Sequence, residues 1–177
     1  AEVVASDKSR DIAILKLERI PEGITAIKFG KPCLPGQSIH SVGNPGASGA
    51  LWSYAFGKVR QNYYMQSRFD FGKTQMQMLE TTAMINPGDS GGPIVNDAGE
   101  LVGLSQSYHR QHRGYAYGVD ISEIKWFLKK YRKSQTNTVQ SEDKPQGGSG
   151  SVFSNPSAAT SGSFKDVDLF ASALKDN

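Results

Sequence analysis

The 177-residue chain is poor in cysteine, in histidine and in net charge. Its single cysteine, Cys33, excludes an internal disulfide and a cysteine-based zinc site, so the fold must be stabilised by its core. The chain has no run of about 18 apolar residues and opens with no basic and apolar leader. We therefore expect neither a transmembrane span nor a retained signal peptide, and the composition indicates one globular domain with an appended segment.

The net charge of +3 is unevenly distributed, with +5 in residues 1–133 and −2 in residues 134–177. A charge of this size lacks the clustered lysine and arginine that nucleic-acid binding usually requires, so we expect no nucleic-acid partner. The exception is the run 129–133 (KKYRK). We interpret it as cations in the last turn of a helix, which the helix dipole favours, in preference to a nucleic-acid patch.

The C-terminal part of the chain differs in composition from the rest. Residues 134–163 are rich in Ser, Gly, Thr and Gln and too poor in apolar residues to fold, so we predict a linker there, following a folded domain over residues 1–133. Beyond it, apolar residues recur at helical spacing, at Phe164, Val167, Phe170 and Leu174. This pattern predicts a short amphipathic helix over 164–177, which either docks on the body or a partner or stays frayed.

Upstream, short apolar segments alternate with turns rich in Gly, Pro and Asn. They predict seven strands, at residues 12–17, 38–42, 54–61, 76–81, 92–95, 101–107 and 115–119. Strands of this length and density favour an all-β barrel or sandwich. Residues 63–73 are expected to form an exposed loop. One helix is predicted to begin at Asp120, with Glu123 reaching back to cap it.

The stretch most informative about chemistry is 86–93 (NPGDSGGP), directly before the next strand. A serine among such small residues is sterically exposed. Gly88 allows the backbone to turn so that its own amide and that of Ser90 point to one spot, an arrangement that stabilises a tetrahedral oxyanion. An ordinary glycine-rich turn with a surface serine has the same composition, so this string alone leaves both interpretations open.

Residues 88–93 (GDSGGP) resemble the nucleophile motif of trypsin-like, chymotrypsin-fold serine endopeptidases. Two further segments resemble the HtrA/Deg-like branch and occur in its order. Residues 11–17 (DIAILKL) are similar to the strand that carries the triad aspartate, and residues 42–46 (VGNPG) to the strand and turn that open the second barrel. Three spaced motifs in one order are much more specific than any of them alone.

The resemblance extends over about residues 7–131, because 99–104 is similar to the strand pair lining the substrate cleft and 117–121 to the last strand. It implies the C-terminal portion of such a protease. The implied fold is a chymotrypsin-like Greek-key β-barrel: the second barrel plus the last strand of the first, a C-terminal helix and a disordered tail.

The resemblance implies that Ser90 is the nucleophile, that Asp11 orients the catalytic histidine, and that the Gly88 and Ser90 amides form the oxyanion hole. In the family that histidine precedes the aspartate, but none of the ten residues before Asp11 is His. The chain has three histidines, His40, His109 and His112. The first lies where the family has no catalytic residue, and the other two lack a third metal ligand. We therefore expect this chain alone to have little or no activity.

The family also implies a primary substrate pocket. Its predicted residues are Met84, Ile85, Asn86, Leu104, Ser105 and Gln106. None carries a carboxylate, which favours a small or medium apolar substrate side chain over Arg or Lys. Asp89 stands where the HtrA-like branch often has asparagine, whereas the digestive branch pairs an aspartate there with a newly cut N-terminus. The positive partner of Asp89 stays open.

Two functions remain open. The first is a serine endopeptidase that acts on a protein or peptide through an acyl-enzyme on Ser90, with the histidine outside this sequence. The second is a non-catalytic peptide-binding module or inactive protease homologue that holds an extended chain by strand addition. No cofactor and no metal are implied. The resemblance suggests an extracytoplasmic location, periplasmic or secreted, and leaves the oligomeric state open.

Overall fold

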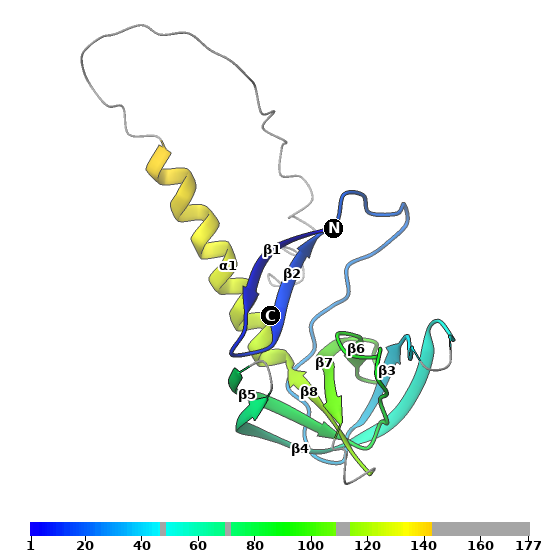
Figure 1. Cartoon of the computed structure of the whole chain (residues 1–177). Helices are drawn as coiled ribbons and strands as arrows, with labels where there is room; N and C mark the ends of the chain where they lie inside the picture. Colours follow the sequence, from blue (N-terminus) through cyan, green and yellow to red (C-terminus); the bar gives the residue numbers. More distant parts are fainter. Residues whose placement is uncertain (47–48, 70–71, 109–113, 143–177) are drawn as a thin grey trace, which may run out of the picture.

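The computed structural model describes residues 1–46, 49–69, 72–108 and 114–142. These residues form eight strands and one helix: β1 (Glu2–Asp7), β2 (Ile12–Lys16), β3 (Ser38–Gly43), β4 (Ser53–Phe69), β5 (Gly72–Thr81), β6 (Pro93–Val95), β7 (Leu101–Tyr108), β8 (Ala116–Asp120) and α1 (Ile121–Glu142). Strands β1 and β2 form a separate hairpin, and the other six form a closed barrel in the order β3-β4-β5-β8-β7-β6 (Figure 1).

The barrel closes because β3 pairs with β4 on one side and with β6 on the other, both antiparallel. Along β3 the buried residues alternate with half-exposed ones, as expected for a strand with one face inside a barrel. The interior holds two apolar clusters. Their fully buried members include Ile39, Met76, Met78, Leu79 and Val102. The predicted all-β barrel with a C-terminal helix is confirmed.

Each of the seven predicted strands is present, and the predicted strand 12–17 is β2. The sequence did not predict its partner β1, which pairs with it from Glu2↔Lys16 to Asp7↔Ile12. The apolar residues of β1 are weakly buried, with Val3 60% exposed, so the segment lacks the alternation of a half-buried strand.

The prediction of an exposed loop over residues 63–73 is wrong. Strand β4 continues to Phe69 and pairs with β5 up to Phe69↔Gly72, so this segment is a long hairpin. The Tyr63 hydroxyl donates to Glu80, and Met65 packs against the core. Aromatic residues have high strand propensity when cross-strand partners are present, which explains the extension.

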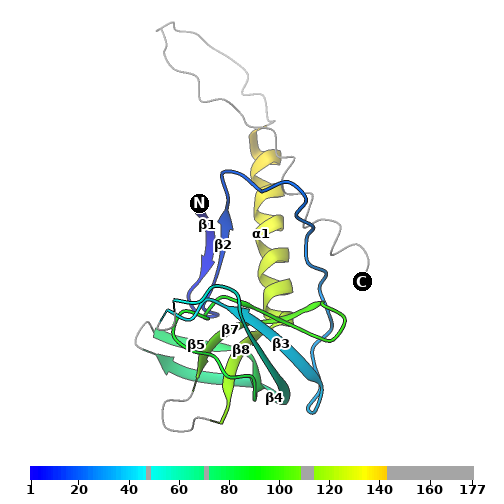
Figure 2. The same ribbon diagram turned by 90° about the vertical axis from the view of Figure 1, so that its right-hand side faces the viewer.

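Helix α1 begins where it was predicted. Asp120 Oδ1 accepts hydrogen bonds from the Ser122 amide at 2.8 Å and the Ser122 hydroxyl at 2.6 Å, which satisfies helix N-terminal donors. Residues Ile121, Ile124 and Phe127 are buried against the barrel. Both views show the first turns of α1 beside the barrel and the β1–β2 hairpin, and its far end extending away (Figures 1 and 2).

The helix is longer than expected, because it continues to Glu142 and so includes the start of the predicted linker 134–163. Its polar side chains there bond the preceding turn: Ser134 Oγ donates to the Tyr131 carbonyl and Thr136 Oγ1 to that of Arg132. The predicted helix 164–177 and the rest of the tail lie outside the described residues, so the division into domain, linker and terminal helix stays a prediction. No helix in the described ranges is long and apolar enough to cross a membrane.

Candidate active site

Ser90 lies in the turn that joins β5 to β6, and its side chain is exposed. The turn is tightened by two backbone hydrogen bonds, from the Asp89 amide to the Asn86 carbonyl and from the Gly92 amide to the Asp89 carbonyl, both at 3.0 Å. Ser90 Oγ donates to the main-chain carbonyl of Gln106 on β7 at 2.8 Å. The hydroxyl is thus accessible and held in one direction.

The Ser90 turn interlocks with the turn that follows β3. A Cβ added to Gly92 would overlap the Val42 carbonyl oxygen, and one added to Gly88 would lie 2.5 Å from the Asn44 carbonyl oxygen. Gly88 also has a φ of 107°, which disfavours any other residue. The backbones of the two glycine-containing motifs are therefore in direct contact.

Asp89 belongs to this turn and is 8% exposed, with its side chain packed against Gly43 of β3. Its Oδ2 accepts a hydrogen bond from the Asn86 amide at 2.8 Å. Its Oδ1 is buried and has no hydrogen-bond partner among the described residues, and no described cation forms an ion pair with this carboxylate. The question of a positive partner for Asp89 thus stays open for the part of the chain that is described.

The Gly88 and Ser90 amides donate to no described residue. Both amides are therefore available to an oxyanion that forms beside the serine hydroxyl. That they form an oxyanion hole stays a prediction.

Asp11 lies in the turn between β1 and β2 and has a φ of 53°, a left-handed conformation that aspartate tolerates better than most residues. Its Oδ2 accepts a hydrogen bond from Gln106 Nε2 at 3.2 Å. Gln106 therefore contacts both predicted catalytic residues, Ser90 through its main chain and Asp11 through its side chain. The sequence interpretation placed Gln106 in the substrate pocket and did not anticipate this bridge.

The hairpin turn that carries Asp11 is fastened to helix α1 by Arg10. Arg10 Nε donates to Glu123 Oε2 at 2.6 Å, and its guanidinium lies 3.8 Å from the centre of the Trp126 ring. The other oxygen of Glu123 accepts from the Gln77 amide on β5 at 2.8 Å. Glu123 thus binds Arg10 and β5, and the prediction that it caps its own helix is wrong.

Asp7 on the hairpin also binds Arg10 and so helps to hold its side chain in place. Arg10 Nη1 donates to Asp7 Oδ2 at 3.1 Å, and the Ser9 hydroxyl donates to Asp7 Oδ1 at 2.6 Å. Burial disfavours the Asp7 charge, but the hydrogen bonds from Ser9 and the charge of Arg10 outweigh burial, so the pKa of Asp7 lies below its ordinary value. This carboxylate stays ionised at neutral pH and favours the ordered turn.

The predicted pocket residues do not all face one way. Met84 is 44% exposed, whereas Ile85 is buried. Leu104 packs against the barrel core. Ser105 is also buried, and its hydroxyl lies 3.0 Å from that of Ser41, so it belongs to the barrel interior. A pocket formed by this set stays a prediction.

Among the described residues, no histidine contacts Ser90 or Asp11. His40 Nδ1 lies 2.7 Å from the Tyr54 hydroxyl and its Nε2 lies 2.9 Å from Asp97 Oδ1. His40 is thus engaged elsewhere on the barrel. His109 and His112 lie outside the described residues.

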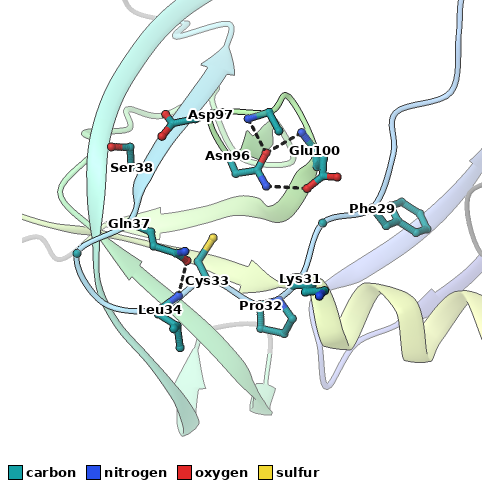
Figure 3. Close-up of a pocket in the computed structure, with 13 residues that line it drawn as sticks. Phe29, Lys31, Pro32, Cys33, Leu34, Gln37, Ser38, Asn96, Asp97 and Glu100 are labelled. Atoms are coloured by element: carbon teal, nitrogen blue, oxygen red, sulfur yellow. Dashed lines mark hydrogen bonds between the residues drawn. The ribbon is translucent and has the colours of Figure 1, made fainter. Parts of the chain in front are cut away.

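A hollow of about 710 Å³ lies between the segment before β3 and the turn joining β6 to β7 (Figure 3). Cys33 lines it, and burial, followed by the charge of Asp120, raises the pKa of its thiol. Neither Ser90 nor Asp11 lines this hollow. A raised thiol pKa disfavours the thiolate, which is the nucleophilic form of cysteine.

Residues 1–104, more than half of the chain, match the family model described as a trypsin-like peptidase domain. Protease Do-like 1, chloroplastic, of Arabidopsis thaliana is 32% identical over 130 residues, which make up 69% of this chain and 28% of that protein. Serine protease Do-like HtrA of Lactobacillus helveticus is 30% identical over 135 residues, 70% of this chain and 31% of that protein.

Solved structures show the same fold at lower sequence identity. The active form of the Rv3671c protease from M. tuberculosis matches with a TM-score of 0.65 and 22% identity, over 73% of this chain and 57% of that one. The HtrA-type protease AlgW with decapeptide matches with a TM-score of 0.60 and 23% identity, over 75% of this chain and 40% of that one.

The chain spans less than a third of the length of these two curated relatives. Both relatives are Do-like proteases, and the resemblance read from residues 88–93, 11–17 and 42–46 points to the same group. By its family model and its relatives, the chain belongs to the trypsin-like peptidase family, in its HtrA/Do-like branch.

Proposed function

We propose that this chain carries the nucleophile half of a serine endopeptidase site, in which Ser90 forms an acyl-enzyme with a peptide substrate. The observation that carries the proposal is the Gln106 bridge. Its carbonyl accepts from Ser90 Oγ at 2.8 Å, and its side-chain amide donates to Asp11 at 3.2 Å. The bridge brings Ser90 and Asp11, which we propose as the nucleophile and the orienting carboxylate, to one residue, although they are far apart in the sequence.

In the proposed reaction, Ser90 Oγ attacks the carbonyl carbon of the scissile peptide bond while its proton passes to a histidine. The negative charge on the carbonyl oxygen is stabilised by the Gly88 and Ser90 amides. The C–N bond then breaks, and the proton moves from the histidine to the leaving amine. Water hydrolyses the resulting ester. Gln106 engages Asp11 through Oδ2, which leaves Oδ1 to accept an N–H from that histidine.

The histidine is proposed to come from a first-barrel segment outside this sequence. Support comes from the length comparison, because the chain corresponds to only 28% of Protease Do-like 1. Without a base, the oxyanion site and substrate binding alone retain about 10³- to 10⁴-fold acceleration over water in enzymes of this type. We therefore expect the chain by itself to be nearly inactive.

The proposed substrate is a protein or peptide with an apolar residue before the cleaved bond. Met84, Ile85, Asn86, Leu104, Ser105 and Gln106 carry no charge that would attract a cation. The proposed location is extracytoplasmic. A relative from Marinomonas sp. is described as a probable periplasmic serine endoprotease, DegP-like, which supports this assignment.

The test uses a fluorophosphonate probe, which reacts with activated serines, followed by mass spectrometry. We compare this chain with the same chain carrying its native upstream extension. Labelling at Ser90 in the extended chain only, abolished in Ser90→Ala and strongly reduced in Asp11→Asn, supports the proposal. No labelling in either form contradicts it.

A second candidate, a non-catalytic peptide-binding module, is favoured by the absence of a described histidine next to Ser90. It predicts peptide binding that is unchanged in Ser90→Ala, together with no turnover in the extended chain. Isothermal calorimetry with peptide and the labelling experiment above separate the two.

A further inference from the structure

The basic run 129–133 lies in the middle of α1. The helix continues to Glu142, and its last turn contains no basic residue. The sequence interpretation explained these cations as favourable charges at a helix C-terminus, and that explanation is wrong because dipole stabilisation falls off within the last turn. A cluster of cations in the middle of a helix requires another explanation.

The cations gather on one side of α1. Successive residues of a helix are rotated by about 100°, so Trp126, Lys129, Lys130 and Lys133 fall on one face. Ile124 and Phe127 occupy the opposite face and are buried against the barrel. We define the basic face as this exposed side with its flanking cations: Lys125, Trp126, Lys129, Lys130, Arg132 and Lys133.

None of the cations of the basic face forms an ion pair with a described carboxylate. Lys125 Nζ donates to the neutral Gly30 carbonyl at 2.9 Å. Arg132 Nη2 is buried and has no hydrogen-bond partner among the described residues. The carboxylate of Glu123 on the same helix is already bound by Arg10 and the Gln77 amide. The face therefore presents positive charge that the described part of the molecule does not neutralise.

An aromatic side chain lies among these cations. Trp126 is 43% exposed, with the Arg10 guanidinium 3.8 Å and Lys130 Nζ 5.0 Å from its ring centre. A hollow of about 410 Å³ beside it is lined by four residues of the face, Lys125, Trp126, Lys129 and Arg132. Tryptophan flanked by long cationic side chains is the combination that settles at the headgroup level of a membrane.

We propose that the basic face of α1 binds a membrane surface rich in anionic phospholipid. Lipid phosphates supply acceptors for the exposed ammonium groups of Lys129, Lys130 and Lys133, and they lie in a plane that one helix face can meet along its length. The apolar residues of the first turns of α1, Ile121, Ile124 and Phe127, are buried against the barrel and cannot insert into a bilayer, so contact is limited to the headgroup region. A nucleic-acid-binding domain usually carries a larger excess of Lys and Arg than the net charge of +3 of this chain.

The test measures sedimentation of the chain with vesicles of equal parts phosphatidylglycerol and phosphatidylcholine, compared with pure phosphatidylcholine. Near an anionic surface each lysine or arginine strengthens binding by about fivefold. The double variant Lys129→Gln/Lys133→Gln should therefore bind about 25-fold more weakly. The matched control, Lys58→Gln/Lys73→Gln, removes the same charge from exposed barrel residues and should bind within about twofold of the parent.

A second readout comes from Trp126 in a Trp52→Phe background, where Trp126 is the remaining tryptophan. We expect its emission to shift to shorter wavelength on anionic vesicles and to return when salt is added. Equal binding to both vesicle types overturns the proposal. So does equal weakening by the two double variants, or binding to duplex DNA, but not to vesicles, that depends on Lys129 and Lys133. Circular dichroism of each variant confirms that α1 is retained.

Discussion

The barrel that carries Ser90 and the hairpin that carries Asp11 are stabilised in different ways. The barrel is closed, so each of its six strands has two partners and its core residues are fully buried. The hairpin has two strands, and Val3 and Leu15 on it are 60% and 57% exposed. The Ser90 side of the predicted site is therefore held by a closed barrel, whereas the Asp11 side depends on a few contacts and leaves apolar surface uncovered.

Those few contacts lie at the turn of the hairpin. Arg10 binds Glu123 on α1, and the Gln75 amide on β5 donates to the Ser9 carbonyl at 3.0 Å. Asp11 follows directly and reaches Gln106. The position of Asp11 relative to Ser90 is thus determined at the turn, while the other end of the hairpin extends away from the barrel (Figure 2).

The largest expected effect is a difference in unfolding free energy between two leucine-to-alanine substitutions, one in the barrel and one in the hairpin. Leu79→Ala removes a fully buried barrel side chain and should lower the free energy of unfolding by about 3 kcal/mol. Leu15→Ala removes a side chain that is 57% exposed and should cost less than about 0.5 kcal/mol. Urea unfolding measures both. Equal costs would show that the hairpin is packed as tightly as the barrel.

A second comparison concerns the interlocked turns. Gly92→Ala forces a Cβ into the Val42 carbonyl and should lower the free energy of unfolding by about 2 to 3 kcal/mol. Gly114→Ala is the matched control, because its Cβ would meet open space and its φ is not positive, and it should change stability by less than about 0.5 kcal/mol. If Gly92→Ala is as mild as the control, the contact between the two turns is looser than described.

The substitution Arg10→Met removes the ion pair that links the hairpin to Glu123 on α1. This change leaves the partly buried Glu123 carboxylate without its cation, and we expect a loss of about 2 kcal/mol in unfolding free energy. In Arg10→Met/Glu123→Gln the uncompensated charge is gone, so about half of the loss should be recovered. Hydrogen exchange at the Gln77 amide reports the local effect. A double variant no more stable than the single one would contradict this account.

The smallest effect is a pH dependence. The folded pKa of Asp7 lies below its unfolded value, so its contribution is complete above the unfolded pKa of about 3.9 and is lost as the pH falls through the lower folded value. Asp7→Asn should therefore flatten the acid limb of a plot of unfolding free energy against pH. An unchanged acid limb would show that other carboxylates dominate.

The parts of the fold that the sequence predicted are those determined by local pattern. The barrel strands alternate or end at Gly, Pro and Asn, and Asp120 precedes an amphipathic run. Strand β1 and the far half of β4 were missed because pairing partners, and not their own sequence, make them strands. The length of α1 was missed because residues 134–142 are mostly polar and lack the apolar spacing that marks the first turns of the helix.

The predicted site also has one part that local sequence indicates and one part that only the fold reveals. The Ser90 turn was predictable because its glycines and hydroxyl are adjacent in sequence. The Gln106 bridge was not, since Gln106 and Asp11 are 95 positions apart and only the folded chain brings them together. The ion pair between Arg10 and Glu123 joins residues 113 positions apart and was likewise not predicted. The only sequence feature that could have drawn attention to Arg10 is its position directly before Asp11.

The central proposal is that the Ser90 side of the predicted site is formed by the barrel of this chain, and that the Asp11 side requires further first-barrel strands to be ordered. Amide hydrogen exchange of this chain, compared with the same chain carrying its native upstream extension, tests it most directly. We predict that the amides of β1 and β2 exchange much more slowly in the extended chain, while those of β5 and β7 change little. Hairpin amides protected equally in both forms would contradict the claim.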